Sequence, residues 1–437
     1  MLHKAGALLR LFLCLSPYCL HVDDGEVAMR GWQRCLLACA CVFGAWPVAA
    51  EVARVDDAPL ALVVLSRHGV RAPTQHADTL AQWSARPWPA WTVGRGELSA
   101  RGAALAETMG RAYGARLGLA ACPQSDEISL YADVDERTRA TAAALARGLS
   151  AACPPRVVSA SGKLDALFHP VKAGVCALDA GKARTAMLAA AGGDLARYAD
   201  RQAASLTLIQ QALGPTPDAL CASEGVRAPC ALTRLPTRIV PRRADGHANI
   251  ALAGGLALAS DAAEVLMLDA VEWPEGQRAG AAALSRMLDA HVAAFALTQW
   301  TPYLAQRRGS ALLARLAAEL VRAGTPGSPR LSVLVGHDTN LANVGALLGA
   351  RWQVADWPVR ATPPAGALVF AVYRGEGGAR EVRAEYWAQP LSGLLAGGNE
   401  VAPARARVTL NACPDGACAL DTLLGAMRRA ADPACVP

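Results

Sequence analysis

Three apolar segments of this chain run directly into charged residues, and each is followed by a pattern typical of a helix. "LALVVL" (60–65) precedes "SRHGVRAPT", "ISLYA" (128–132) precedes "DVDERTR", and "LSVLVG" (331–336) precedes "HDTN". Strand–turn–helix units of this kind build open α/β sheets, in which ligands bind at the carboxyl ends of the strands. If these strands are neighbours, their charged ends converge on one pocket.

The residues at these strand ends suit a phosphate group. Buried positive charge is costly unless an anion meets it, and arginine binds phosphate oxygens through parallel N–H groups. Arginine can stabilise phosphoryl transfer without a metal or another cofactor, and a neutral imidazole is a competent nucleophile toward phosphorus. The predicted donors to the phosphate are Arg67, Arg71, Arg137 and His337.

Asp338 is the candidate general acid, which would protonate the leaving alkoxide. It lies at the predicted start of a helix (from about Thr339) and near arginines, and both lower a carboxyl pKa. An arriving phosphate dianion raises that pKa again. We therefore expect an enzyme that works best at acid pH.

The remaining pattern predicts an α/β fold: a doubly wound mixed sheet with an inserted, mainly α-helical domain. We assign 51–176 and 299–437 to the α/β phosphatase domain, and 177–298 to the inserted helical domain. Turn signals interrupt the insertion at "GPTPD" and "VPRRADGH", and "GALVFAVYR" and "EVRAEYWA" predict a late antiparallel pair.

Residues 1–50 resemble an upstream extension and a signal peptide. From Met29 the chain has two arginines, an apolar stretch and the small-residue site Val48-Ala49-Ala50, after which we expect cleavage. Met1 and Met29 both remain possible starts, and "LLAC" leaves a lipoprotein as the minor alternative. No later segment has the roughly 20 apolar residues of a membrane helix, so we expect no membrane partner.

Cysteine and lysine usage narrow the class of protein. Eight of the 13 cysteines follow the predicted leader, and an even count behind a secretion signal predicts disulfides in the periplasm or outside the cell. The cysteine spacing does not match a structural zinc site. Lysine is rare and no basic, aromatic stripe occurs, so we expect no nucleic-acid partner. We expect a monomer that binds a small phosphomonoester.

The three motifs together resemble the histidine acid phosphatases, most closely the bacterial periplasmic enzymes that act as phytases. "FHPVKAGVCALD", "GHANIALAGGLALASDAAEVLML" and "TPPAGALVF" support the resemblance over the predicted mature chain. It implies His68 as the nucleophile and Asp338 as the proton donor, with Thr74 and Glu264 lining the substrate pocket. It also implies four disulfides: Cys122–Cys153, Cys176–Cys435, Cys221–Cys230 and Cys413–Cys418.

One position departs from the phytase pattern. Phytase-like relatives often carry a lysine after the threonine of "RHGVRAPT", where this chain has Gln75 followed by His76. The change puts a preference for phytate (inositol hexakisphosphate) in doubt, since a cation there would help to bind the extra phosphates. Other charged residues receive supporting roles: Arg139 at the helix surface or pocket rim, and His169, His247 and His291 as structural residues, with His291 within reach of the pocket.

The main hypothesis is a secreted acid phosphomonoesterase that works through a phosphohistidine, with phytate as the leading substrate. A glucose-1-phosphatase-like enzyme with narrow sugar-phosphate specificity is the alternative within the same chemistry. An intracellular phosphoglycerate mutase relative fits the leader and the cysteines poorly. A non-enzymatic phosphosugar-binding protein would need neither His68 nor Asp338.

Overall fold

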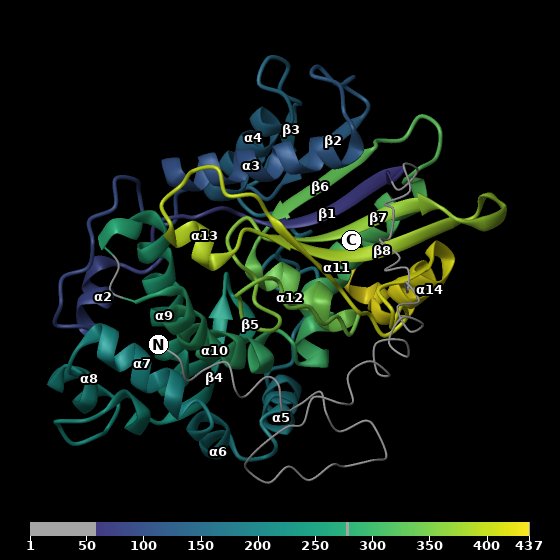
Figure 1. The fold of residues 1–437 in the computed structure, drawn as a ribbon. Helices are drawn as coiled ribbons and strands as arrows, with labels where there is room; N and C mark the ends of the chain where they lie inside the picture. The colour runs from purple at the N-terminus through teal and green to yellow at the C-terminus, as the bar shows by residue number, and fades with distance from the viewer. Residues whose placement is uncertain (1–57, 277–278, 437) are drawn as a thin grey trace, which may run out of the picture. The chain divides into compact units, whose positions relative to one another are not determined.

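One mixed sheet of eight strands organises the computed structural model, which describes residues 58–276 and 279–436 (Figure 1). Across the sheet the strands are β10 (Ala417–Ala419), β8 (Arg380–Ala388), β7 (Ala367–Arg374), β1 (Ala61–Arg67), β6 (Leu331–Gly336), β2 (Ile128–Ala132) and β3 (Val157–Ser159), with β9 (Ala404–Arg407) paired to β8. β1, β6, β2 and β3 are mutually parallel, whereas β7 to β10 add antiparallel partners. The predicted mixed sheet is confirmed.

The central strand β1 is buried on both faces, as its continuous apolar sequence requires. Its alternate side chains enter two different cores. Val63 and Leu65 pack into the larger core, whereas Leu62 and Val64 pack into the core on the other face. A sheet that is buried on both sides must be covered by helices on both sides.

The covering helices lie as the doubly wound prediction requires (Figure 1). Met109 and Tyr113 of α3 and Leu145 of α4 pack on one face with Leu62. Leu316 of α11 packs on the other face, in the core that also holds α12 and α14. The bounds of these helices are α3 Ala100–Leu117, α4 Glu136–Leu149, α11 Pro302–Arg322, α12 Asp338–Leu347 and α14 Leu420–Ala430.

Helices α3 and α12 each begin after an N-cap residue whose contacts the structure shows. Ser99 caps α3, and its hydroxyl accepts a hydrogen bond from the backbone N–H of Gly102. The helix predicted from about Thr339 begins at Asp338, with His337 as its N-cap. The strand–turn–helix unit at 128–149 is also present, as β2 and α4.

The region from 177 to 298 is mostly helical, but it also contains a hairpin that the sequence analysis did not predict. Its helices are α5 (Ala180–Ala190), α6 (Leu195–Asp200), α7 (Ala203–Leu213), α8 (Asp218–Ser223), α9 (Gly255–Glu272) and α10 (Ala281–Thr298). "VPRRADGH" was predicted as a turn, whereas most of it belongs to β4 (Thr237–Ala244), which pairs antiparallel with β5 (His247–Gly254). The division into domains at 176/177 and 298/299 stays a prediction.

The hairpin has a clear physical origin. Asp245 and Gly246 both have positive φ, of 47° and 83°, which suits the two-residue turn that Asp-Gly favours. Proline is unusual within a strand, and Pro241 has no N–H to donate to the partner strand. In a ribbon of two strands each strand is an edge, so the missing donor costs little.

Further short elements complete the described chain. They are α2 (Ala77–Trp83), α13 (Leu391–Leu395) and 3₁₀ turns at Leu232–Arg234, Pro274–Gly276, Glu376–Gly378 and Pro433–Cys435. No helix of residues 58–276 and 279–436 combines the length and the apolar character needed to cross a bilayer. The predicted extension and signal peptide at 1–50 lie outside the described residues.

All four predicted disulfides are present: Cys122–Cys153, Cys176–Cys435, Cys221–Cys230 and Cys413–Cys418. The Cys176–Cys435 bond joins residues 259 positions apart in sequence. It closes by far the longest loop of the four, and in the chain-entropy model long loops give the greatest constraint on the unfolded chain.

Candidate active site

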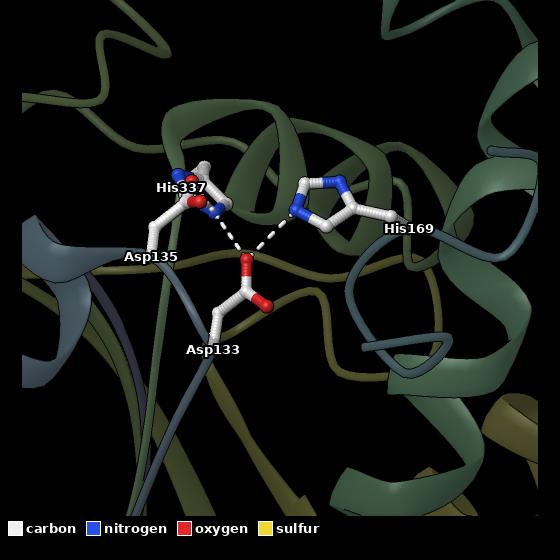
Figure 2. Close-up of side chains that lie close together, drawn as sticks. All are labelled: Asp133, Asp135, His169 and His337. Atoms are coloured by element: carbon white, nitrogen blue, oxygen red, sulfur yellow. Dashed lines mark hydrogen bonds and ion pairs between the residues drawn. The ribbon is translucent and has the colours of Figure 1, made fainter. Parts of the chain in front are cut away.

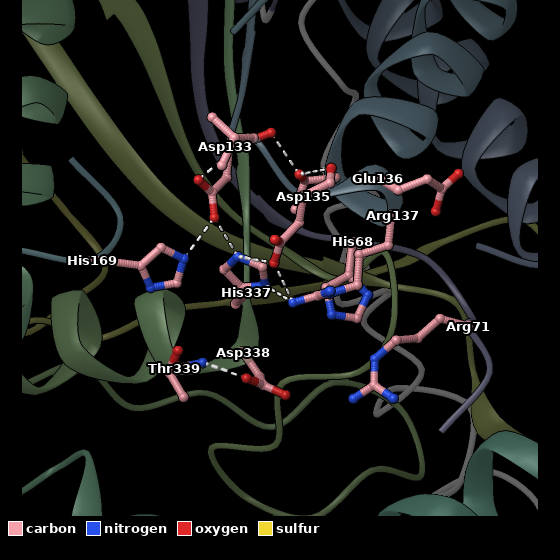
Figure 3. Close-up of polar contacts among 12 residues, drawn as sticks. His68, Arg71, Asp133, Asp135, Glu136, Arg137, His169, His337, Asp338 and Thr339 are labelled. Atoms are coloured by element: carbon pink, nitrogen blue, oxygen red, sulfur yellow. Dashed lines mark hydrogen bonds and ion pairs between the residues drawn. The ribbon is translucent and has the colours of Figure 1, made fainter. Parts of the chain in front are cut away.

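The predicted convergence of strand ends is present in the structure. β6 lies between β1 and β2 and runs parallel to both, so all three strands end at the same edge of the sheet. Arg67 lies beside Gly336 in register, and the His68 N–H donates to the Gly336 carbonyl at 2.9 Å. The side chains that follow these strands therefore gather in one place (Figure 3).

The loop after β1 is pressed against helix α3, which fixes the direction of the catalytic motif. Gly102 makes this possible, because a Cβ there would lie 2.2 Å from the Val70 carbonyl oxygen. The Gly69 N–H is held by the Thr141 hydroxyl of α4 at 2.9 Å. Two helices thus hold the backbone that carries His68 and Arg71.

His68 is buried and neutral, in the tautomer that a nucleophile needs. Its Nδ1 lies 2.9 Å from the Gly69 carbonyl oxygen, which can only accept, so Nδ1 carries the proton. The lone pair is then on Nε2. Burial lowers the pKa of His68 well below its ordinary value, and the positive charges of Arg67 and Arg71 lower it further. The imidazole therefore stays unprotonated at acid pH.

Arg67 is 2% exposed and is anchored on several sides. Its Nη1 donates to the Thr362 carbonyl at 2.7 Å, and its Nη2 contacts Oδ2 of Asp338 at 2.9 Å. The same Nη2 also donates to Oε1 of Glu264. A guanidinium held in this way keeps one orientation, which is what recognition of a phosphate requires.

Glu264 lies against two of the predicted phosphate ligands. Its Oε1 accepts from Arg71 Nη2 at 3.1 Å as well as from Arg67. Burial alone would raise the pKa of Glu264, but Arg71 and Arg67 hold it below its ordinary value. The sequence analysis predicted Glu264 as a pocket residue and did not foresee that its carboxylate offsets part of the arginine charge.

Asp338 is the first residue of α12, and each of its oxygens already has a partner. Oδ1 accepts a hydrogen bond from the Thr339 N–H at 2.7 Å, and Oδ2 forms an ion pair with Arg67. Burial would raise the pKa of Asp338, but Arg67 and His291 hold it below the ordinary value. The resting carboxyl is therefore ionised, as the helix start and the arginines predicted.

His337 is connected to two residues whose roles the sequence analysis missed. Its Nε2 lies 2.6 Å from Oδ2 of Asp133, and His169 Nε2 lies 2.7 Å from the same oxygen (Figure 2). Asp133 directly follows β2, so the strand-end rule that found the other site residues also applied to it. His169 was predicted to be structural, and no local pattern linked it to Asp133.

Arg137 approaches the site from the first turn of α4. Its Nη2 pairs with Oδ2 of Asp135 at 2.5 Å and lies 3.4 Å from Nδ1 of His337 (Figure 3). One nitrogen or oxygen atom from each of Asp133, Asp135, His169 and His337 lies within 4.8 Å of the others, so these four side chains form one polar cluster.

Three predicted phosphate ligands share an unused donor. The Nε–H groups of Arg67, Arg71 and Arg137 are buried and have no hydrogen-bond partner within the described residues. Buried donors normally have partners, so an acceptor is expected here. Other arginines in the described chain also have an unpaired Nε–H. What distinguishes these three is that the charge of each lowers the pKa of the same imidazole, His68.

The remaining predicted residues differ in exposure and in what they contact. Thr74 is exposed on the loop after β1. Gln75 lines a separate cavity of about 390 Å³ with His76. His291 is buried, with Nδ1 3.1 Å from the Ser260 hydroxyl oxygen, whereas Arg139 and His247 are exposed.

A second cavity, of about 420 Å³, is lined by Thr339, the residue that follows Asp338 in the chain. Lys172, His169 and Arg308 also line it. Arg308 donates to the Thr298 carbonyl at 2.6 Å and to Asn249 Oδ1 at 2.7 Å, and it pairs with no carboxylate in the part of the chain that the structure describes. Burial lowers the pKa of Arg308 to about 10, which still leaves it charged.

Comparison with known proteins agrees with this geometry. Residues 61–216 match the model of the histidine phosphatase superfamily (branch 2). The chain is 35% identical to the phytase AppA of Escherichia coli over 337 residues, which cover 72% of this chain and 76% of that protein. It belongs to the histidine phosphatase superfamily. This histidine phosphatase is thus a phosphomonoester hydrolase, as its sequence predicted.

Other relatives of this histidine phosphatase cover most of its length. A glucose-1-phosphatase of Salmonella typhimurium is 26% identical over 85% of this chain and 92% of that protein. The structure of Hafnia alvei phytase in complex with tartrate superposes with a TM-score of 0.78 and 30% identity, over 87% of this chain and 98% of that one. Citrobacter braakii phytase gives a TM-score of 0.76 at 28% identity, over 86% of this chain and 98% of that one.

Proposed function

We propose that this histidine phosphatase is an acid phosphomonoesterase that forms a phosphohistidine on Nε2 of His68. The observation that carries the proposal is the neutral His68 imidazole, whose proton is held on Nδ1 by the Gly69 carbonyl. A nitrogen nucleophile needs an available lone pair at the working pH. The low pKa of His68 supplies that lone pair even in acid.

In the first step Nε2 of His68 attacks phosphorus, and the bond from phosphorus to the alkoxide oxygen breaks. The dianionic substrate raises the pKa of Asp338, so that the carboxylate binds a proton. Asp338 then donates this proton to the alkoxide. Arg67, Arg71 and Arg137 offset the charge on the phosphoryl oxygens. The products of this step are a free alcohol and a phosphohistidine.

In the second step water attacks the phosphohistidine, and the bond from phosphorus to Nε2 breaks. Asp338, now ionised, accepts the proton of the attacking water. Inorganic phosphate leaves, and His68 returns to its neutral form. The two steps together consume one water molecule. The side chains named here can carry out both steps without a cofactor.

Chemical trapping tests the nucleophile. A labelled phosphoester should leave acid-labile, base-stable label on His68, and His68→Ala should lose on the order of 10⁴-fold in turnover. His247→Ala, which removes an exposed histidine, is the matched control and should keep both label and activity. Label on a serine or an aspartate, or no label at all, would refute the mechanism.

We further propose phytate as the leading substrate. Only one phosphate of phytate can react at His68, so the others need cations elsewhere. The cavity next to Thr339 offers Lys172 and the half-buried Arg308, which has no carboxylate partner among the residues that the structure describes. Such a cation gains more from a polyanion than from a monophosphate. The relatives named as phytases agree with this assignment.

Arg308→Gln separates phytate from smaller substrates. It should raise KM for phytate on the order of ten-fold, which corresponds to one lost charge-assisted contact, and leave p-nitrophenyl phosphate nearly unchanged. Arg315→Gln, in the same helix but paired with Glu319, is the control. If wild-type enzyme prefers glucose 1-phosphate to phytate in kcat/KM, the glucose-1-phosphatase-like alternative replaces this one.

We also propose that the mature protein is a periplasmic or secreted monomer. Its four disulfides need an oxidising compartment to persist. Fractionation of the native host should find activity outside the cytoplasm, and light scattering should give the mass of one chain. Activity confined to the cytoplasm, or a dimer mass, would contradict this assignment.

A further inference from the structure

Asp133 is a fully buried carboxylate that two imidazoles share. One oxygen, Oδ2, lies 2.6 Å from His337 Nε2 and 2.7 Å from His169 Nε2 (Figure 2). The other oxygen, Oδ1, accepts the Val134 N–H at 2.8 Å. Because a carboxylate can only accept, both Nε2 atoms carry protons.

This bonding fixes what a neutral His337 can do. With its proton on Nε2, its Nδ1 has only a lone pair, which lies 3.4 Å from Arg137 Nη2. A neutral His337 can therefore accept at Nδ1 but cannot donate to a phosphoryl oxygen there. It becomes a donor to phosphate only when Nδ1 binds a second proton.

The charges of the three groups show where that proton can go. Asp133 contributes −1, so one added proton makes the trio of Asp133, His169 and His337 neutral. The proton can reside on His337, which faces the phosphate site, or on His169, whose side chain is 28% exposed and lines the cavity next to Thr339. Two imidazoles thus compete for one counter-ion.

We propose that Asp133 is the counter-ion that allows His337 to donate from Nδ1 to the bound phosphoryl group, and that His169 competes with His337 for it. Both are positioning residues that act through His337. The inference rests on the proposed phosphatase function. On this proposal the trio sets the upper pH limit of activity, because phosphate binds well only while His337 holds its second proton.

In the resting site the pKa of His337 lies below its ordinary value, because burial and the charges of Arg137 and His169 outweigh the bond to Asp133, which raises it. A bound phosphate dianion adds negative charge beside the imidazole and raises that pKa. Burial would raise the pKa of Asp133, but the bonds from His169 and His337 hold it well below its ordinary value. Asp133 therefore stays ionised across the working range.

Other charged groups lie near the trio. On the side of the phosphate site they are His68, Asp135, Arg137 and Asp338, along the cavity they are Lys172, Asp261 and Arg308, and Asp165 precedes His169 in the chain. Substitution of His169 or Asp133 leaves all of these in place. A change in the pH profile can then be assigned to the trio.

The distances favour shared protons over a metal ion at this cluster. Tetrahedral ligands about 2.0 Å from zinc lie roughly 3.3 Å from each other, whereas Asp133 Oδ2 is 2.6 and 2.7 Å from the two Nε2 atoms. Separations this short are those of charge-assisted hydrogen bonds.

The test is the pH dependence of kcat/KM for p-nitrophenyl phosphate. Asp133→Asn should lower kcat/KM on the order of 10- to 100-fold, as loss of a histidine's carboxylate partner does in other sites. It should also move the upper apparent pKa down by about one unit. His169→Asn should move that pKa up by about half a unit, because a competing charge is removed.

Shifts of opposite sign distinguish positioning from simple loss of structure. Asp165→Asn is the matched control, because Asp165 is also buried nearby but accepts from Tyr131 and lies outside the trio. It should leave the upper apparent pKa unchanged. An unchanged upper pKa in Asp133→Asn, or an unchanged or lowered one in His169→Asn, would overturn the inference.

A measurement without turnover separates this inference from the proposed function. In ¹⁵N-histidine-labelled enzyme at pH 7, added inorganic phosphate should convert His337 from the singly to the doubly protonated form. Asp133→Asn should abolish the conversion. A His337 that stays singly protonated in the wild-type complex overturns the inference even if the enzyme is an active phosphatase. If no phosphoester is hydrolysed, the proposed function fails by itself.

Discussion

Oδ2 of Asp338 lies 2.9 Å from Nη2 of Arg67, so the proposed acid and a proposed phosphate ligand are an ion pair in the resting site. The pair keeps Asp338 ionised and therefore unable to donate a proton. A phosphate dianion that reaches Arg67 competes for this guanidinium and raises the proton affinity of the carboxylate. Binding of substrate thus prepares its own acid.

Asp338→Asn should discriminate between leaving groups. It should lower kcat/KM for an alkyl phosphate by about 10²- to 10⁴-fold, because the alkoxide then leaves without a proton. The loss for p-nitrophenyl phosphate should be at most about ten-fold, since that leaving group needs little protonation. Equal losses for both esters would show that Asp338 is not the general acid.

Glu264→Gln should tighten binding of inorganic phosphate. The glutamine keeps an oxygen for Arg67 and Arg71 but removes a negative charge that contacts both. We expect the inhibition constant of phosphate at pH 5 to fall about three- to ten-fold, or roughly 0.7–1.4 kcal/mol. Glu272→Gln, in the same helix but bonded to Ser99, serves as the control. Weaker phosphate binding in Glu264→Gln would mean that Glu264 matters for arginine orientation and not for charge.

Asp261 should make phytate binding depend on pH. Asp261 is exposed on the wall of the cavity that holds Arg308, where loss of hydration and the charge of Glu264 raise its pKa to about 7. Below this pH Asp261 is neutral, and above it an added negative charge repels the polyanion. Asp261→Asn should therefore lower KM for phytate a few-fold at pH 8 and leave it unchanged at pH 5. Asp289→Asn, in α10, is the control, and an equal effect at both pH values would exclude titration of Asp261 as the cause.

Gln75→Lys tests the departure from the phytase pattern. A lysine at the rim should lower KM for phytate by a few-fold, about 0.5–1 kcal/mol, and the gain should vanish at high salt. His76→Ala should raise KM for phytate more at pH 4.5 than at pH 7 if His76 already supplies a charge there. If neither variant distinguishes phytate from p-nitrophenyl phosphate, residues 75 and 76 do not face the substrate.

The strand ends explain why so much of the site could be predicted from sequence. Each motif follows a buried strand, and parallel neighbouring strands end at one edge, so His68, Arg137 and His337 had to meet. This strand-end rule can be applied from short stretches of sequence alone. Asp133 obeys it too, but an aspartate after a strand is common, and its importance depends on partners 36 and 204 residues away.

The parts that escaped prediction depend on contacts distant in sequence. The resemblance placed Glu264 in the pocket, but its contact with Arg67, 197 residues earlier in the chain, depends on the position that the fold gives to α9. Arg308 resembles any helical arginine in the sequence, and only the fold shows that its described partners include the Thr298 carbonyl and Asn249 but no carboxylate. The hairpin at 237–254 was missed because the whole of "VPRRADGH" was predicted as a turn, whereas only its Asp-Gly pair forms the turn between the two strands.

The position of β6 between β1 and β2 has a consequence for the order of folding. The segment 331–336 enters the sheet between two strands that precede it by about 200 residues or more in the chain. Until it inserts, β1 and β2 have no common neighbour, and any direct pairing between them would block its place. The proposed nucleophile and the proposed acid are therefore brought together by the same event that closes the sheet, so a chain arrested before that event has every earlier motif but not the pocket that they form.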